Sequence, residues 1–116
     1  MGNEYYDNGT LKFEGDYLNG KIYNGYGYNI NGQIQFEIKD GKGKGKEYHY
    51  NGKLIFEGEY LNGERNGKGK EYYKNGELNF VGEYLNGKRW NGVGKEYDYY
   101  DQLVFAGEYI NGKRIE

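Results

Sequence analysis

The sequence predicts an all-β protein, a single-layer, twisted antiparallel meander of stacked β-hairpins in an elongated, solenoid-like array. Three observations carry this prediction: a motif centred on Phe returns at spacings of 23, 20, 24 and 25 residues, the dipeptide Asn-Gly occurs eleven times, and apolar residues alternate around each Phe. Asn-Gly is the strongest short signal for a hairpin, because a type I′ turn needs a positive φ at both central residues. Helices are excluded because each interior glycine would cost about 1 kcal/mol.

The motif defines five units, at residues 4–27, 28–45, 46–69, 70–94 and 95–116. Four of them carry Phe, then Gly, then Tyr at fixed spacing, and we expect these to be the structural positions of the array: Phe13, Gly15, Tyr17, Phe56, Gly58, Tyr60, Phe80, Gly82, Tyr84, Phe105, Gly107 and Tyr109. The second unit departs from the motif, because Ile38 and Asp40 stand where Gly and Tyr are expected. The continuity of the array is therefore in question at that unit.

The fourth unit illustrates the expected hairpin, with its turn at Asn75-Gly76. Alternation places one set of side chains on a common face: Leu78, Phe80, Gly82 and Tyr84. A two-residue loop would pair Tyr73 with Leu78, whereas a three-residue loop would pair Tyr72 with it. The recurring column of Tyr48, Tyr72 and Tyr97 favours the three-residue loop. We also expect Gly82 and its equivalents to let an aromatic ring of the adjoining unit lie on the backbone.

Composition excludes several classes of function. The 116 residues suit one domain of net charge −2, with no Cys, no Ser, one Thr and one His. A disulfide framework, a Ser/His/Asp or Cys/His catalytic set and a His-rich zinc site cannot be built from them. We expect no enzymatic activity, no cofactor and no metal. Aliphatic residues are few, but 19% of the chain is aromatic, so Tyr is expected to supply much of the core.

The order Gly-x-Gly, Tyr, Asn-Gly, Phe-x-Gly-Glu-Tyr, Asn-Gly resembles the MORN repeat, including its bacterial variant, over residues 4–116. The resemblance implies a β-meander of stacked hairpins and a non-catalytic scaffold that binds proteins through an aromatic groove with a charged rim. It also implies that some relatives dimerise, that phospholipid binding has been proposed, and that some bacterial relatives neutralise toxins. An immunity partner of a toxin is therefore an alternative function.

The residues expected to bind a protein partner combine the types that dominate interaction hot spots. They are Trp90, Tyr23, Arg89, Tyr99 and Tyr100. For Trp90, an alternative is that it only covers the open face of its hairpin. A homodimer through an edge strand or a terminal unit is also expected to be feasible, because open strand edges pair readily.

Anionic phospholipid is the alternative ligand from another class. The basic residues that would contact its headgroups are Lys42, Lys44, Lys46, Lys88 and Arg89. Nucleic acid is not expected, because the net charge of −2 opposes binding to a phosphate backbone. With no signal-peptide layout and no long apolar run, the expected location is the cytoplasm.

Two further patterns are given structural readings. The segment from Gly82 to Lys88 matches the spacing of a phosphate-binding loop, but Arg89 stands where Ser or Thr must reach magnesium, and no helix follows. A column of acidic residues at one phase is expected to be a solvated ladder opposite basic residues, not a catalytic pair: Asp16, Glu59, Glu83 and Glu108.

Overall fold

The computed structural model describes residues 2–116, in which every regular element is a strand. The strands are β1 (Gly2–Tyr5), β2 (Leu11–Leu18), β3 (Lys21–Tyr28), β4 (Ile34–Ile38), β5 (Gly43–Tyr48), β6 (Leu54–Leu61), β7 (Glu64–Tyr72), β8 (Leu78–Leu85), β9 (Lys88–Tyr97), β10 (Leu103–Ile110) and β11 (Lys113–Arg114). The prediction of an all-β chain built from hairpins is confirmed.

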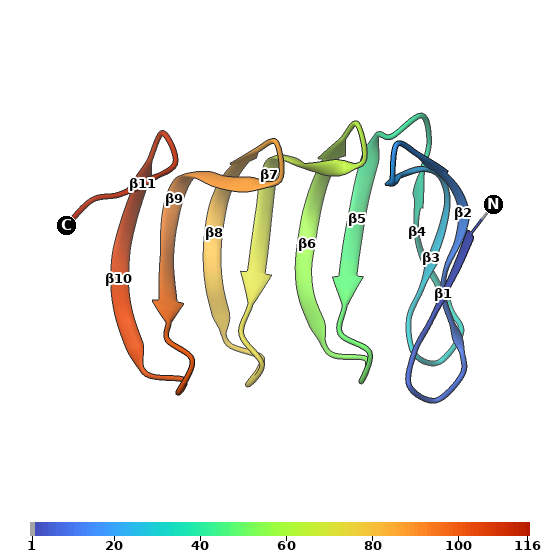
Figure 1. Ribbon diagram of the computed structural model, residues 1–116, viewed down its shortest axis with the longest axis horizontal. Helices are drawn as coiled ribbons and strands as arrows, with labels where there is room; N and C mark the ends of the chain where they lie inside the picture. Colours follow the sequence, from blue (N-terminus) through green and yellow to red (C-terminus); the bar gives the residue numbers. More distant parts are fainter. Residues whose placement is uncertain (1) are drawn as a thin grey trace.

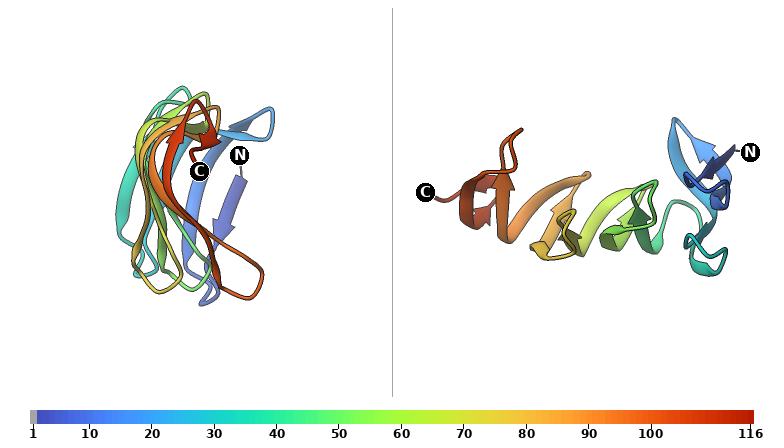
Figure 2. Two further views of the ribbon diagram at one scale, coloured as in Figure 1. Left: turned by 90° about the vertical axis from the view of Figure 1, so that its left-hand side faces the viewer. Right: turned by 90° about the horizontal axis from the view of Figure 1, so that it is seen from below.

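The strands form two antiparallel sheets, and neither closes into a barrel. Each strand pairs with its neighbours in sequence, so the orders are β1-β2-β3-β4 and β5 through β11 without a crossover. The molecule measures 43 × 29 × 20 Å, and the seven-stranded sheet occupies most of the long axis, with the two termini at opposite ends (Figure 1). Viewed from below, the four-stranded sheet is turned away from the larger one (Figure 2).

The core of the larger sheet is a chain of aromatic rings on one face. Phe56 and Phe80 are fully buried. Each contacts the Tyr of its own strand edge-on and also the Tyr of the next hairpin: the Phe56 and Tyr84 ring centres are 5.1 Å apart, and those of Phe80 and Tyr109 are 5.5 Å apart. Edge-to-face pairs at this distance contribute about 0.5–1.5 kcal/mol beyond burial. Rings from successive hairpins therefore interlock along the array.

Glycines of the Gly-x-Gly segments provide the flat backbone on which these rings lie. A Cβ added at Gly69 would lie 2.8 Å from the Phe56 ring and 2.9 Å from the Tyr84 ring, and one at Gly94 would lie 2.6 Å from the Phe80 ring. Gly82 has a different role from the one predicted. A Cβ there would meet the carbonyl oxygen of Asn91 at 2.2 Å, so this glycine permits close approach of the β9 backbone, not of a ring.

Two kinds of turn alternate along the chain. At Asn86-Gly87, as at the other turns of that edge, both central residues have positive φ, as a type I′ turn requires. At Asn75-Gly76 only the glycine does, with Gly76 N–H bonded to the Tyr73 carbonyl. The expected type I′ geometry is therefore wrong for that turn, which is a three-residue loop with glycine in the left-handed position. The pairing of Tyr72 with Leu78 confirms the register predicted from that loop length.

The break between the two sheets lies at the unit that departs from the motif. An added Cβ at Gly58 would lie 2.6 Å from the Cα of Gly69 on the following strand. Ile38 occupies the equivalent place in β4, is 1% exposed, and carries the side chain for which such a strand leaves no room. Strands β4 and β5 consequently do not pair, and only an isolated bridge between Lys39 and Lys42, in the turn that joins them, continues the ladder. The prediction of one continuous meander is wrong at this point.

Candidate functional site

A cluster of Glu, Tyr and Arg covers the aromatic face of each hairpin in the larger sheet. The carboxylate accepts the hydroxyl hydrogen of a Tyr 13 residues later and pairs with an Arg 18 residues later. The three clusters are Glu47–Tyr60–Arg65, Glu71–Tyr84–Arg89 and Glu96–Tyr109–Arg114. This spacing is visible in the sequence, but the three Glu residues were not among the predicted site residues, because each lies on a different strand from its partners.

The central cluster shows how the charges are satisfied. Glu71 accepts from the Tyr84 hydroxyl at 2.6 Å and from Nε and Nη2 of Arg89 at 3.1 and 3.0 Å. Arg65 reaches the same carboxylate at 3.5 Å, so neighbouring clusters are linked. The Arg89 guanidinium also lies over the Phe80 ring, 4.8 Å from its centre. Each guanidinium therefore covers a buried ring while it neutralises a carboxylate.

The protonation of these groups follows from this arrangement. Burial alone would raise the pKa of Glu71, but the hydrogen bonds from Arg89 and Tyr84 and the positive charges of Arg89 and Arg65 outweigh it, so the pKa lies below its usual value. In the same way, Arg65 and Tyr60 hold the pKa of Glu47 down against burial. Burial, then the adjacent carboxylate, raises the pKa of Tyr84 and of Tyr60. The clusters of Glu47 and Glu71 are therefore ion pairs whose charges the fold stabilises.

On the aromatic face of the larger sheet, the Tyr rings and hydroxyls are taken up by contacts within the clusters, and a hollow of about 410 Å³ remains beside Arg89 and Tyr109. Tyr84 and Tyr109 are 3% and 5% exposed, and their hydroxyls are already bonded. In the first hairpin the equivalent cluster lacks its Arg. The Tyr17 hydroxyl donates to Glu4, but Ile22 occupies the position of the Arg. The aromatic rings that the sequence suggested as a binding groove therefore mainly bind one another.

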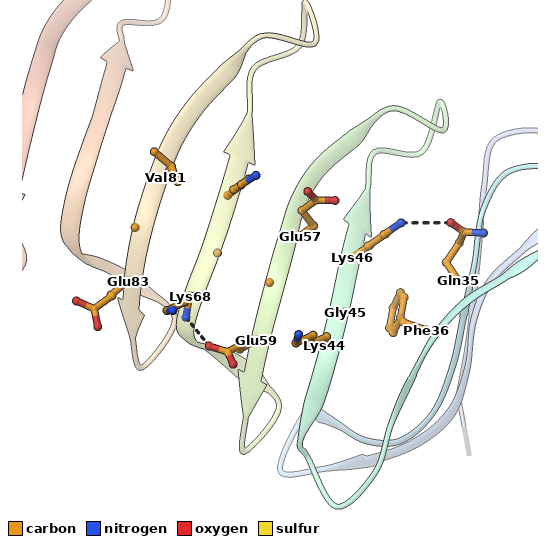
Figure 3. A pocket seen from close by; sticks show the side chains of 14 residues that line it. Gln35, Phe36, Lys44, Gly45, Lys46, Glu57, Glu59, Lys68, Val81 and Glu83 are labelled. Atoms are coloured by element: carbon orange, nitrogen blue, oxygen red, sulfur yellow. Dashed lines mark hydrogen bonds between the residues drawn. The ribbon is translucent and has the colours of Figure 1, made fainter.

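An open groove lies across strands β5 to β8, and we call it the trough. Its volume is about 650 Å³. Its floor is a row of glycines paired strand to strand: Gly45, Gly58, Gly69 and Gly82. Its two walls are the side chains that flank those glycines, Lys44, Glu59, Lys68 and Glu83 on one side and Lys46, Glu57, Lys70 and Val81 on the other (Figure 3). Phe36 and Gln35 of β4 close the end beside β5.

The charges of the trough alternate in bands across the strands. Strand β5 contributes Lys44 and Lys46, and β6 contributes Glu57 and Glu59. Strand β7 repeats the positive band with Lys68 and Lys70, and β8 supplies Glu83 beside Val81.

Most of these charges remain available to a ligand. Among residues 2–116, no salt bridge within 4.0 Å joins a trough Lys to a trough Glu. Their hydrogen bonds are few: Glu59 accepts the backbone N–H of Lys68 at 2.7 Å, Glu57 accepts the Tyr72 hydroxyl at 2.9 Å, Glu83 accepts the Asn91 amide at 3.4 Å, and Lys46 donates to Gln35 at 3.4 Å.

The predicted partner-binding residues do not form one surface. Arg89 belongs to the central cluster, with only 16% of its side chain exposed. Trp90, its neighbour in β9, is half-buried, and its ring covers the turn at Gly112, whose N–H bonds to the Trp90 carbonyl at 2.8 Å. Tyr23 lies in β3, where its carbonyl accepts from Gly41 in the same way. Both positions thus brace a turn of the next hairpin.

Tyr99 and Tyr100 lie in the turn between β9 and β10, at the opposite edge from Trp90. They are 93% and 77% exposed and contact each other edge-on at 5.3 Å. The rings of Tyr73 and Tyr97, at the ends of β7 and β9, form a second pair whose centres are 4.2 Å apart and whose planes are tilted by 33°. Tyr99 and Tyr100 therefore form an exposed aromatic patch that is separate from the trough.

The predicted lipid-binding lysines are also divided. Lys44 and Lys46 lie in the trough, next to Glu57 and Glu59. Lys42 and Lys88 lie at turns, both exposed, and Arg89 is enclosed in its cluster. These residues do not form a continuous basic surface.

Comparison with protein-family models, curated proteins and solved structures finds no match. Within the part of the chain that the structure describes, no group of three or more His, Cys, Asp or Glu side chains could hold a metal ion. The same residues include no helix of the length and apolarity needed to cross a membrane.

Proposed function

We propose that this protein is a non-catalytic scaffold of the MORN-repeat type, a solenoid-like array whose trough binds a protein partner. The observation that supports this is the contrast between the two faces of the larger sheet. On the aromatic face, Arg and Glu side chains are paired with one another over buried rings. In the trough, charged side chains flank bare backbone and leave a volume of about 650 Å³.

A protein partner suits this chemistry better than a lipid surface. Both signs of charge alternate in the trough, so an anionic headgroup layer that approached Lys44 and Lys46 would also meet Glu57 and Glu59. Like charges brought together oppose binding, whereas a polypeptide can present both signs in matching order. We expect the alternating charges of the trough to set the register of the partner.

Site-specific photocrosslinking tests this proposal. A photoreactive amino acid at Lys68, in the trough, is expected to crosslink to a discrete protein in cells that naturally make this chain. The matched control carries the same amino acid at Lys113, which is exposed on the last turn. No crosslink from Lys68, or the same products from both positions, would contradict a trough-based scaffold.

Anionic vesicles test the competing ligand directly. We expect the protein to stay in the supernatant when vesicles of mixed phosphatidylserine and phosphatidylcholine are pelleted at low salt. Pelleting that is lost on changing Lys44 and Lys46 to Glu would favour a membrane partner instead.

A further inference from the structure

We infer that the first hairpin binds an arginine side chain of a partner polypeptide, in a hollow beside Glu4 and Tyr17. This inference goes beyond the proposed function, because the site lies in the first hairpin of the four-stranded sheet and not across β5 to β8. Three features carry it: a backbone register that the first hairpin shares with the three clusters, a residue that differs in it, and a hollow at that place.

The first hairpin repeats the backbone register of the three clusters. In each cluster the Glu pairs with the Phe of the following strand, and the Tyr of that strand pairs with the Arg of the strand beyond it. The first hairpin has the same pairs with one substitution, since Glu4 pairs with Phe13 and Tyr17 pairs with Ile22. The Tyr17 hydroxyl also donates to Glu4, as each Tyr does within its cluster. The backbone therefore presents a carboxylate, a Tyr and a Phe in the same arrangement four times.

Ile22 is the difference, because it gives the first hairpin no cation of its own. In the second hairpin of this kind, Nε and Nη2 of Arg65 lie 2.9 and 2.8 Å from the two oxygens of Glu47. A planar guanidinium fork matches a carboxylate better than an ammonium group does. Ile22 is shorter than Arg and carries no donor, and among residues 2–116 no salt bridge within 4.0 Å joins Glu4 to a Lys or Arg. The other three sites thus show which group this carboxylate is shaped to receive.

A hollow of about 380 Å³ lies at this place. Its lining includes all four residues that correspond to a cluster: Glu4, Phe13, Tyr17 and Ile22. Tyr17 is 38% exposed, whereas the enclosed Tyr84 is 3% exposed, so the first site can be reached from solvent. Phe13 itself is only 3% exposed. We therefore expect an entering guanidinium to lie beside the Tyr17 ring while its nitrogens donate to Glu4.

Three lysines also line the hollow, but each ammonium group has a contact elsewhere. The contacts are those of Lys21 with Glu64, Lys46 with Gln35 and Lys12 with the ring of Tyr50. The other carboxylate of the lining, that of Glu47, is already paired with Arg65. Glu4 is therefore the ionic partner that remains for a ligand, and the surrounding lysines oppose a ligand with several positive charges.

Amide NMR spectra recorded with capped peptides test the inference. The probe is acetyl-Gly-Arg-Gly-amide, added up to millimolar concentrations, and the control peptides carry Lys, Glu or citrulline, the neutral analogue of Arg, in its place. We expect the Arg peptide to shift the amide signals of Tyr17 and Ile22 and to leave that of Lys68, in the trough, unchanged. It should bind about fivefold more tightly than the citrulline peptide, which keeps the shape but loses the charge. The Lys peptide should fall between the two, because an ammonium group cannot form the fork.

Paired variants assign the binding to the hollow. Glu4→Gln should weaken binding of the Arg peptide about fivefold, whereas Glu14→Gln, an equal change of charge on the opposite face of β2, should alter it less than about twofold. Ile22→Arg should supply the guanidinium from within the chain and remove the shifts, whereas Ile22→Val should keep them. A retained dispersion of the amide signals shows that each variant is folded.

Several results would overturn the inference. They are no shift with the Arg peptide, equal affinity for the Arg and citrulline peptides, tighter binding of the Glu peptide, equal effects of Glu4→Gln and Glu14→Gln, or undiminished binding to a folded Ile22→Arg variant. Tighter binding of free arginine than of the capped peptide would also overturn it, because the ligand would then be the amino acid and not a polypeptide. The photocrosslinking result stays independent, since Lys68 lies in β7, outside the lining of the hollow.

Discussion

Replacing Glu71 with Gln should lower the free energy of unfolding more than replacing any other single Glu or Asp of the larger sheet with its amide. This carboxylate accepts three hydrogen bonds, from Tyr84 and twice from Arg89, and it lies 3.5 Å from a second guanidinium, that of Arg65. Its side chain is only 20% exposed. Gln keeps the shape and one acceptor oxygen, but it leaves the half-buried Arg89 without its negative partner.

The expected loss follows from these contacts. Hydrogen bonds to charged groups contribute about 1.5–3 kcal/mol each, and breaking one side of a buried pair costs about 3–5 kcal/mol, so we expect the free energy of unfolding to fall by about 3 kcal/mol. For a domain of this size, 1 kcal/mol corresponds to about 4 °C, which gives a fall in Tm of about 12 °C.

Urea unfolding, followed by far-ultraviolet circular dichroism and by the fluorescence of Trp90, measures this loss. The matched control is Glu83→Gln, because Glu83 is exposed and, among residues 2–116, its carboxylate accepts a side-chain hydrogen bond only from the Asn91 amide, at 3.4 Å. A surface change of this kind should stay within about 0.5 kcal/mol. If both variants lost the same amount, the clusters would not be the stabilising element that we describe.

The same contacts predict a dependence on acid. Because the pKa of Glu71 is lowered in the fold, its contribution is present above its unfolded pKa of about 4.3 and is lost as the pH falls through the folded value. The pKa of Glu47 is also lowered in the fold, so its contribution to stability is lost in acid in the same way. The wild-type protein should therefore lose stability below about pH 4, and Glu71→Gln should lose less over that range. Parallel curves for the two proteins would refute this reasoning.

Three further predictions concern other parts of the array. Gly69→Ala should lower the free energy of unfolding in urea by about 1–3 kcal/mol, because the added Cβ would press on the enclosed rings of Phe56 and Tyr84. The control Lys68→Ala, on the same strand, should change it by less than about 0.5 kcal/mol. Equal effects of the two variants would contradict the role of that glycine. Stability should also fall as the pH rises from about 10, because the raised pKa of Tyr84 keeps its proton in the fold after the unfolded chain releases its own, and a flat profile to pH 11 would contradict this. Trp90→Ala should destabilise the protein by about 1–3 kcal/mol in urea, because the Trp90 ring covers the turn at Gly112, and should leave crosslinking from Lys68 unchanged. Loss of the crosslink in a variant of unchanged stability would instead place Trp90 in the binding surface.

The local features of the fold could be predicted from the sequence because they depend on residues close together in the chain. Alternation around Phe80 fixes which side chains share a face, and the loop at Asn75-Gly76 fixes the pairing of Tyr72 with Leu78. Turn geometry was predicted less well, since the same Asn-Gly dipeptide adopts two turn types at the two edges of the sheet. The length of the loop between the paired strands decides which type forms.

The candidate site was harder to predict because its residues meet only across strands. The partner of Arg89 is Glu71, 18 residues earlier, and this pairing turned a predicted binding residue into a covered one. In the trough, Lys44 and Lys46 were visible as basic residues, but their alternation with Glu57 and Glu59 depends on the register of β5 with β6. A list of charged residues carries no information about that register.

The sequence by itself determined that this chain forms β-hairpins, where each one turns, and which side of each strand carries the rings, since glycine, turn residues and alternation act over a few neighbouring positions. Only the tertiary structure decided that the strands divide into two sheets, because the bulk of Ile38 matters only against the strand that would have lain beside it. It also decided which face is filled and which is open, because burial of the rings and pairing of the charges depend on what the next hairpin brings into contact.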